Sequence, residues 1–157
     1  MLAPGDRAPD FQVPDQFGSV LDLAEVRQRS VAVVTFFPFA FSPVCGDEIR
    51  ALQELHEELR AASRPIEVIG IAADSKYTLA AWSRDAGVTF SLGSDFWPHG
   101  QVAEAYGVLD EKHGVAERAV FVISRTGTIV SSRQVARSAA RDFQLDIASA
   151  MSAFQEG

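Results

Sequence analysis

The stretch from Ser30 to Phe37, with the sequence SVAVVTFF, constrains the fold more than any other part of this 157-residue chain. It is short, rich in β-branched and aromatic residues, and apolar at even and odd positions alike. A strand of this kind is covered on both of its faces, as the central strands of α/β sheets are. Pro38 ends the strand, because proline has no N–H group to donate to a ladder.

The hydrophobic period changes soon after this strand. Four aliphatic residues recur at steps of three and four, which is the spacing of one helix face: Ile49, Leu52, Leu55 and Leu59. This spacing predicts a helix over residues 45–62. Asp47 and Glu48 are expected in its first turn, where the helix dipole favours acidic side chains.

Strands and helices also alternate along the rest of the chain. The expected elements are a hairpin within residues 10–23, a strand at 66–73, helices at 75–86 and 101–106, a hairpin of strands 118–124 and 128–134, and a helix at 140–154. No repeat or linker divides the sequence, so residues 1–157 are expected to form one domain. The pattern predicts an α/β fold with a mixed central sheet, helices on both faces and an N-terminal hairpin.

The charge of the chain disfavours two classes of partner. The formal net charge is -7, whereas nucleic acids and anionic membrane surfaces attract clustered Lys and Arg. The longest apolar run, residues 31–40, is about half the length of a membrane span. The N-terminus has no basic segment followed by an apolar one, so no signal peptide is expected.

Cys45 is the single cysteine, and it lies where the buried strand passes into the helix. A cysteine in the first turn of a helix faces free backbone N–H groups and the positive end of the dipole, and both stabilise a thiolate. The alternative is a structural cysteine packed in the core, which the strand-to-helix position and the nearby Ser42 and prolines disfavour. Ser42 itself fits a simple helix cap as well as a group that contacts the sulfur or a substrate.

These residues carry a family resemblance. The pattern Pro38-x-x-x-Ser42-x-x-Cys45 resembles the active-site signature of peroxiredoxins, in which threonine is more common at the serine position. The APDF sequence at residues 8–11 and Arg118 before a β-branched strand resemble two further peroxiredoxin motifs. The stretch 94–100, together with residues 106–108, is most similar to the one-cysteine alkyl hydroperoxide reductase E subgroup of actinobacteria. The resemblance implies a thioredoxin-like fold and a peroxidase site at Cys45, completed by Pro38, Ser42 and Arg118.

The same resemblance implies a reaction and its partners. Cys45 would be oxidised to a sulfenic acid by hydrogen peroxide, an alkyl hydroperoxide or peroxynitrite, and no cofactor would be needed. Because the chain has no second cysteine, an external thiol must reduce the sulfenic acid. Mycothiol with a mycoredoxin, a glutaredoxin or a thioredoxin system are the candidate reductants. A homodimer is also implied. An unpaired reactive thiol favours a reducing compartment, so a cytoplasmic location is expected.

A more acidic thiol is ionised more often, but each thiolate is then less nucleophilic. Fast peroxide reduction therefore needs donors that stabilise the transferring oxygens. We assign this role to Arg118, the Ser42 hydroxyl and backbone N–H groups near Val44 and Cys45. Glu48 lies one turn after Cys45, and our hypothesis is that it positions Arg118 or another arginine. An ordinary first-turn acid is the equal alternative.

Four aromatic residues near Cys45 are candidates for a pocket that accepts organic peroxides, or for core and dimer contacts: Phe36, Phe37, Phe39 and Phe41. Of these, Phe39 is our choice for substrate contact, together with Val44 and Glu48. The three histidines lack the spacing of metal ligands, so no metal site is predicted. A thiol–disulfide reductase is disfavoured by the missing C-x-x-C pair, whereas a redox sensor or binding module that signals through Cys45 oxidation stays open.

Overall fold

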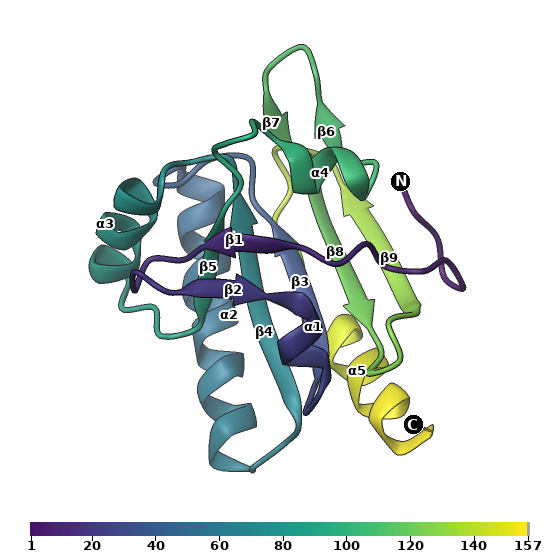
Figure 1. The fold of residues 1–157 in the computed structure, drawn as a ribbon. Coiled ribbons are helices and arrows are strands. Elements are labelled where there is room, and N and C mark those ends of the chain that lie inside the picture. The colour runs from purple at the N-terminus through teal and green to yellow at the C-terminus, as the bar shows by residue number, and fades with distance from the viewer. Residues whose placement is uncertain (157) are drawn as a thin grey trace.

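The structure, a computed structural model, describes residues 1–156 and places a five-stranded sheet at the centre of the domain (Figure 1). The strand order is β5-β4-β3-β8-β9. β3 pairs in parallel with β4, and β4 with β5, whereas β8 runs antiparallel to both β3 and β9. The bounds of these strands are β3 Val31–Phe36, β4 Ile66–Ala72, β5 Ser91–Ser94, β8 Arg118–Ile123 and β9 Ile129–Val135. The predicted mixed sheet is confirmed.

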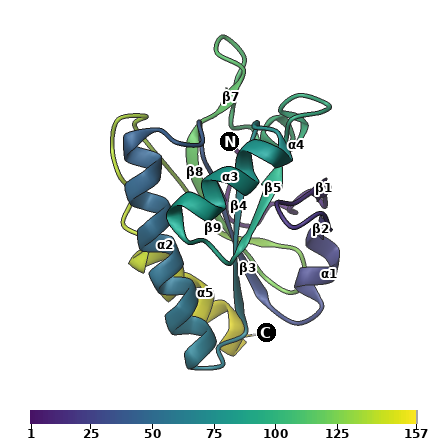
Figure 2. The same cartoon turned by 90° about the vertical axis from the view of Figure 1, so that its left-hand side faces the viewer.

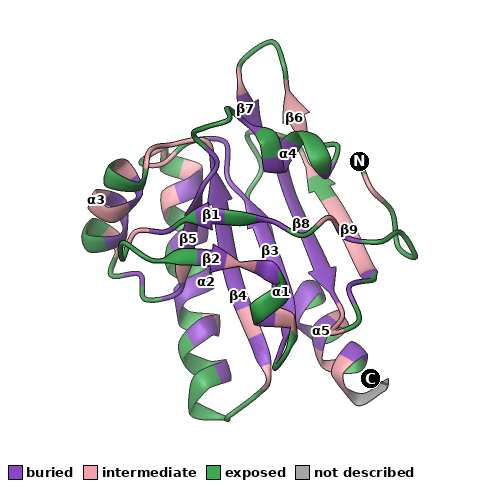
Figure 3. Cartoon of the chain, in the orientation of Figure 1, coloured by how far each residue is buried: buried purple, intermediate pink, exposed green. Residues whose placement is uncertain are grey.

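Helices cover both faces of this sheet (Figure 2). Val31 and Val33 share one core cluster with the three long helices, and Ala32 and Val34 share the other with the short ones. The long helices are α2 Pro43–Ala61, α3 Lys76–Ala86 and α5 Gln144–Glu156, and the short ones are α1 Leu23–Arg27 and α4 Gln101–Ala105. All six residues of β3 are buried, as predicted for a strand covered on both sides (Figure 3).

Two small hairpins complete the fold. The expected N-terminal hairpin consists of β1 Gln12–Pro14 and β2 Val20–Asp22, which pair antiparallel outside the main sheet. A second hairpin consists of β6 Leu109–Asp110 and β7 Val115–Ala116 and projects from the end of the molecule next to α4 (Figure 1). The sequence did not predict this second hairpin, β5 or α1, because the hydrophobic pattern over their few residues does not distinguish them from loops.

Two predicted helix starts were wrong. Helix α2 begins at Pro43 rather than Cys45, because Ser42 is its N-cap and proline is well suited to the first turn. Asp47 and Glu48 therefore lie beyond the first turn, which contains no acidic residue. Helix α5 begins at Gln144 rather than Ala140, because the Gln144 N–H donates to the Asp142 carboxylate. The residues before it form contacts with the site around Cys45 instead.

The loops after β3, β4 and β5 meet at one edge of the sheet, because the three strands are parallel. The Ala40 N–H donates to Asp74 Oδ2 at 3.0 Å and joins the first loop to the second. Burial raises the pKa of Asp74, and the bond from Ala40 acts against this rise. The Asp95 N–H donates to the Ala72 carbonyl at 2.8 Å and joins the third loop. Cys45 follows the first of these loops.

Candidate active site

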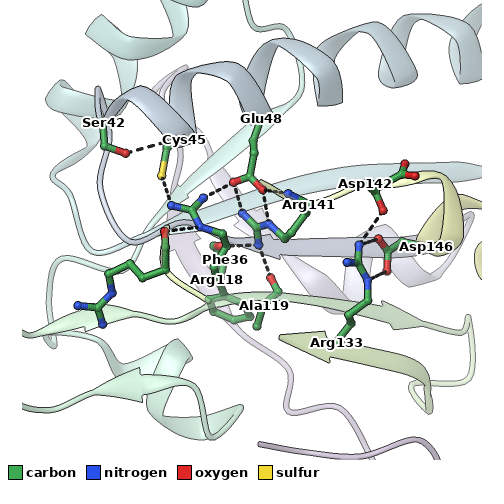
Figure 4. Close-up of polar contacts among 11 residues, drawn as sticks. Phe36, Ser42, Cys45, Glu48, Arg118, Ala119, Arg133, Arg141, Asp142 and Asp146 are labelled. Carbon is green, nitrogen blue, oxygen red and sulfur yellow. Dashed lines mark hydrogen bonds and ion pairs between the residues drawn. The ribbon is translucent and has the colours of Figure 1, made fainter. Parts of the chain in front are cut away.

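Cys45 lies in the first turn of α2 and is completely buried (Figure 4). The Ser42 hydroxyl accepts from the Cys45 N–H at 3.4 Å, so it caps the helix, and this N–H is directed to Ser42. Pro38 is buried in the turn that follows β3. Phe41, which directly precedes Ser42, has a positive φ of 67°, a backbone conformation that is costly for a bulky side chain. The strand-to-helix turn is thus held in one shape by its cap and its prolines.

Arg118, the first residue of β8, provides a cation directly at the sulfur (Figure 4). Its Nη2 donates to Cys45 Sγ at 3.4 Å, its Nε donates to the Arg137 carbonyl at 3.1 Å, and its Nη1 pairs with Glu48 Oε1. The side chain is only 2% exposed. The three nitrogens of one guanidinium therefore have three separate acceptors, which fixes both the position and the plane of the group.

Glu48 points inward from α2 and joins two arginines. Besides Arg118, it accepts from Arg141, whose backbone N–H and Nε reach Oε2 at 2.6 and 2.8 Å and whose Nη2 reaches Oε1 at 2.9 Å. The geometry agrees with the hypothesis that Glu48 positions an arginine. It does not fit an ordinary first-turn acid, because Glu48 is buried and lies beyond the first turn of α2. Two arginines and one carboxylate leave a formal charge of +1 beside Cys45, which a thiolate would balance.

Arg141 is the residue of this cluster that the sequence did not reveal. Its Nη1 donates at 2.8 Å to the carbonyls of both Phe36 and Ala119, which lie on neighbouring strands. The rings of Phe37 and Phe143 lie 5.1 and 5.4 Å from the guanidinium. Burial lowers the pKa of Arg141, and its hydrogen bonds to Glu48 act in the opposite direction. Arg141 lies four residues after Arg137 in an Ala- and Ser-rich stretch, and this stretch carries no sequence pattern that could have indicated its role.

The aromatic candidates divide into core and surface residues. Phe36 packs against Tyr106 and Phe121, and Phe37 packs edge-on against Trp82, so neither of them lines an open pocket. Phe39 is 47% exposed, and Val44 is half-buried. In the described part of the chain, the side chain that donates to the Cys45 sulfur comes from Arg118. The assignment of Phe39 and Val44 to substrate contact stays a prediction.

Residues 1–156 contain neither a membrane-spanning helix nor a cluster of metal ligands. None of the helices described there is long and apolar enough to cross a membrane. Within the same residues, no group of three or more His, Cys, Asp or Glu side chains is arranged to hold a metal ion.

The fold and the cluster define a class of protein. A buried cysteine in the first turn of a helix, with an arginine on its sulfur, belongs to thiol-based oxidoreductases of the thioredoxin-like fold. The model of the AhpC/TSA family matches residues 4–132. The chain therefore belongs to the AhpC/TSA family, the peroxiredoxins, and with its single cysteine it is a one-cysteine thiol-dependent peroxidase.

Individual relatives agree with this family. The chain is 36% identical over 129 residues to alkyl hydroperoxide reductase E of Mycobacterium tuberculosis, which covers 82% of this chain and 83% of the relative. Among solved structures, it is similar to AhpC of Enterococcus faecalis, with a TM-score of 0.87, 25% identity, and coverage of 99% of this chain and 94% of that one. Peroxidoxin BcpB of Mycobacterium tuberculosis, at 24% identity over 99% and 98% of the two chains, shares the fold with a TM-score of 0.83.

Proposed function

We propose that Cys45 is the residue that peroxides oxidise, and that Arg118, Ser42 and Pro38 form its site. The observation that carries this proposal is the contact of 3.4 Å between Arg118 Nη2 and Cys45 Sγ inside a buried cluster. The cluster has a formal charge of +1 before the thiol ionises, so it favours the thiolate that attacks. The same guanidinium lies where an approaching peroxide oxygen would be polarised.

The reaction transfers one oxygen atom. The Cys45 thiolate attacks the terminal oxygen of ROOH, an S–O bond forms, and the O–O bond breaks. The sulfur is oxidised by two electrons, and the leaving RO⁻ takes up a proton to become ROH. Arg118 stabilises the negative charge that develops on the two oxygens, and Val44 and Phe39 are the proposed neighbours of the R group. Hydrogen peroxide, alkyl hydroperoxides and peroxynitrite all provide the required O–O bond.

Recycling of Cys45 needs a partner from outside the chain. A thiol R′SH attacks the sulfenic acid and forms a mixed disulfide with Cys45 while water leaves, and a second thiol then releases Cys45 as a thiol. We propose a low-molecular-weight thiol such as mycothiol with a mycoredoxin, or a glutaredoxin or thioredoxin system, in the reducing cytoplasm. Because Cys45 is fully buried, this partner reaches the sulfur only after the first turn of α2 opens.

The first prediction concerns the rate of the oxidation itself. Reduced protein mixed with hydrogen peroxide or an alkyl hydroperoxide is expected to react at least about a hundredfold faster than free cysteine, because the oxygens meet a preorganised cation. Stopped-flow Trp fluorescence measures the rate, and mass spectrometry identifies the sulfenic acid. Cys45→Ser is the control and should give no reaction.

A rate no higher than that of free cysteine would refute the proposed peroxide reduction. The alternative, a redox sensor or binding module, differs in turnover. A sensor is oxidised once and then waits for a signal, whereas the proposed enzyme consumes many equivalents of peroxide when a reductant system is added. Peroxide consumption limited to one equivalent per Cys45 with each of the three reductant systems would favour the sensor.

A patch of exposed aromatic side chains supports a homodimer. The patch consists of Phe39, Phe41, Tyr77, Phe96 and Trp97, and all five are about half exposed or more. They come from the three loops that meet at one edge of the sheet and from the start of α3, where Tyr77, Phe96 and Trp97 line a groove of about 280 Å³. Together they expose roughly 600 Å² of aromatic surface, which approaches what one subunit buries in a stable interface.

We therefore propose that a second copy of this chain covers the aromatic patch, and we expect Trp97→Ser to give monomers. Trp97 is 81% exposed and so is available as the anchor of the contact. Sedimentation equilibrium at micromolar concentration measures the mass. Leu145→Ser is the matched control, since Leu145 is 66% exposed on α5 and lies outside the patch. A monomeric wild type, or a Trp97→Ser variant that still dimerises, would contradict this surface.

A further inference from the structure

The loop between β9 and α5, residues 136–143, contains Arg141 and contacts Arg118. Near its end, Arg141 binds Glu48 through its backbone and its side chain. Near its start, the Arg137 carbonyl accepts from Arg118 Nε at 3.1 Å. The position of this loop therefore sets the position of Arg118, and what holds the loop bears on the chemistry at Cys45.

The two ends of the loop are held in different ways. The Arg141 end is buried, with side chains of the core on both sides of its guanidinium. The Arg137 end is held from the β6–β7 hairpin. Arg137 Nη2 pairs with Asp110 Oδ2 and lies 3.5 Å from Glu117 Oε1. Asp110 of the hairpin and Glu117, the residue that follows β7, thus both face one arginine whose own carbonyl contacts Arg118.

Asp110 is itself fixed by the turn that it begins. Its Oδ1 accepts from the backbone N–H groups of Lys112 and His113 at 3.0 and 3.3 Å, and its Oδ2 lies 2.7 Å from His113 Nδ1. An aspartate that binds backbone groups two and three residues ahead is held in a single rotamer. The bonds from Arg137 and then from His113 hold the pKa of Asp110 below its ordinary value, so the carboxylate is charged at neutral pH. The hairpin therefore presents a rigid, charged anchor to Arg137.

The orientation of Arg118 depends on its Nε contact. Glu48 holds one end of the guanidinium, and Nη2 at the other end reaches the sulfur. If the Arg137 carbonyl withdraws, the guanidinium keeps Glu48 but becomes free to turn about that contact. Small displacements of a catalytic group cost rate because the reacting atoms must be aligned.

We propose that Asp110 and Arg137 are positioning residues for peroxide reduction: their ion pair holds the Arg137 carbonyl on Arg118 Nε and thereby keeps Arg118 Nη2 at Cys45. This inference rests on the proposed role of Cys45 and Arg118. It assigns to the β6–β7 hairpin, which contributes no group to the sulfur itself, a part in the rate of the reaction. Neither residue touches the peroxide.

A simple surface ion pair is the competing explanation. Arg137 is 36% exposed and Asp110 16% exposed, and partly exposed pairs contribute little to folding. The two explanations differ in what they predict. A surface pair affects neither rate nor stability to a useful degree, whereas a positioning pair affects the rate through Arg118 and leaves the stability nearly unchanged.

The test uses Asp110→Asn in the full-length protein. Asparagine still accepts from the Lys112 and His113 N–H groups, so the turn is kept, while the charge that faces Arg137 and the His113 ring is removed. We expect the second-order rate of Cys45 oxidation by hydrogen peroxide to fall about threefold to fivefold, as loss of one partly exposed ion pair allows. Glu111→Gln is the matched control, because Glu111 is the exposed carboxylate next to Asp110 on the same hairpin.

A double-mutant cycle with Arg118→Ala separates positioning from general damage. When Arg118 is absent, Asp110→Asn should have no further effect on the rate, whereas a variant that loosens the whole site would still lower it. A wild-type rate in Asp110→Asn, or the same fall with and without Arg118, would overturn the inference while leaving the proposed function intact. A wild-type protein no faster than free cysteine would instead refute the proposed function.

Discussion

Replacement of Arg118 by alanine is expected to lower the second-order rate of Cys45 oxidation by about a hundredfold to a thousandfold, the usual effect of removing one preorganised donor from a developing oxyanion. Arg118 is the only residue described here whose side chain donates to Cys45 Sγ. Its loss removes both the cation that favours the thiolate and the donor that meets the transferring oxygens. Glu48 keeps its contacts with Arg141, so the buried carboxylate is still paired in this variant.

Stopped-flow fluorescence with a range of peroxide concentrations measures this effect. Arg84→Ala is the matched control, because Arg84 is exposed on α3 and its loss should leave the rate unchanged. Arg118→Lys should recover only part of the rate, since an ammonium group cannot contact three acceptors in one plane. If Arg118→Ala reacts within threefold of the wild type, the sulfur must be activated by the helix terminus alone.

Replacement of Glu48 by glutamine is expected to lower the free energy of unfolding by about 3–5 kcal/mol, because it leaves two buried arginines without their common counter-ion. The side chains of Arg118, Arg141 and Glu48 are 2%, 0% and 1% exposed. Glutamine has nearly the same shape, so the loss comes from charge rather than from packing. One oxygen is also replaced by an NH₂ group that faces guanidinium donors, and it cannot accept from them.

Urea denaturation followed by Trp fluorescence gives the free energy of unfolding for this comparison. The control is Glu54→Gln, which removes an exposed carboxylate from the same helix. Its effect should stay within about 0.5 kcal/mol. If Glu48→Gln and the wild type have the same free energy of unfolding, the two buried arginines do not need the Glu48 carboxylate as their counter-ion. That result would contradict the charge balance described above.

Much of the fold could be predicted because its main elements bury one or two complete faces. SVAVVTFF became β3, buried at all six positions from Val31 to Phe36, and the leucine stripe from Ile49 to Leu59 became the buried face of α2. Strand β5 and the β6–β7 hairpin escaped prediction because a pattern over two to four residues does not separate a strand from a loop. The start of α5 was misplaced because the Asp142 side chain caps the helix at Gln144 and the contacts of Arg141 with Glu48 hold the preceding residues outside it.

The site was predictable only where local sequence determines it. Cys45 and Ser42 share one turn of helix, so their spacing of three residues determines how close the Ser42 hydroxyl lies to the Cys45 N–H group. Glu48 was left open between two roles, because its partner Arg118 lies 70 residues away and its partner Arg141 93 residues away. No spacing rule connects such positions. Arg141 and Arg137 contribute through backbone groups as well as side chains, and backbone contacts are independent of residue type.

The distance along the chain between Cys45 and its arginines also has a consequence for biosynthesis. The ribosome makes Cys45 first, and 73 further residues must follow before Arg118 exists. The loop that contains Arg141 and contacts Arg118 is made later still, when residues 136–143 have been added. A nascent chain therefore carries an ordinary, unassisted thiol. The contact between Arg118 Nη2 and Cys45 Sγ, and any reactivity that depends on it, can therefore arise only after residue 118 has been made and β8 has joined the sheet.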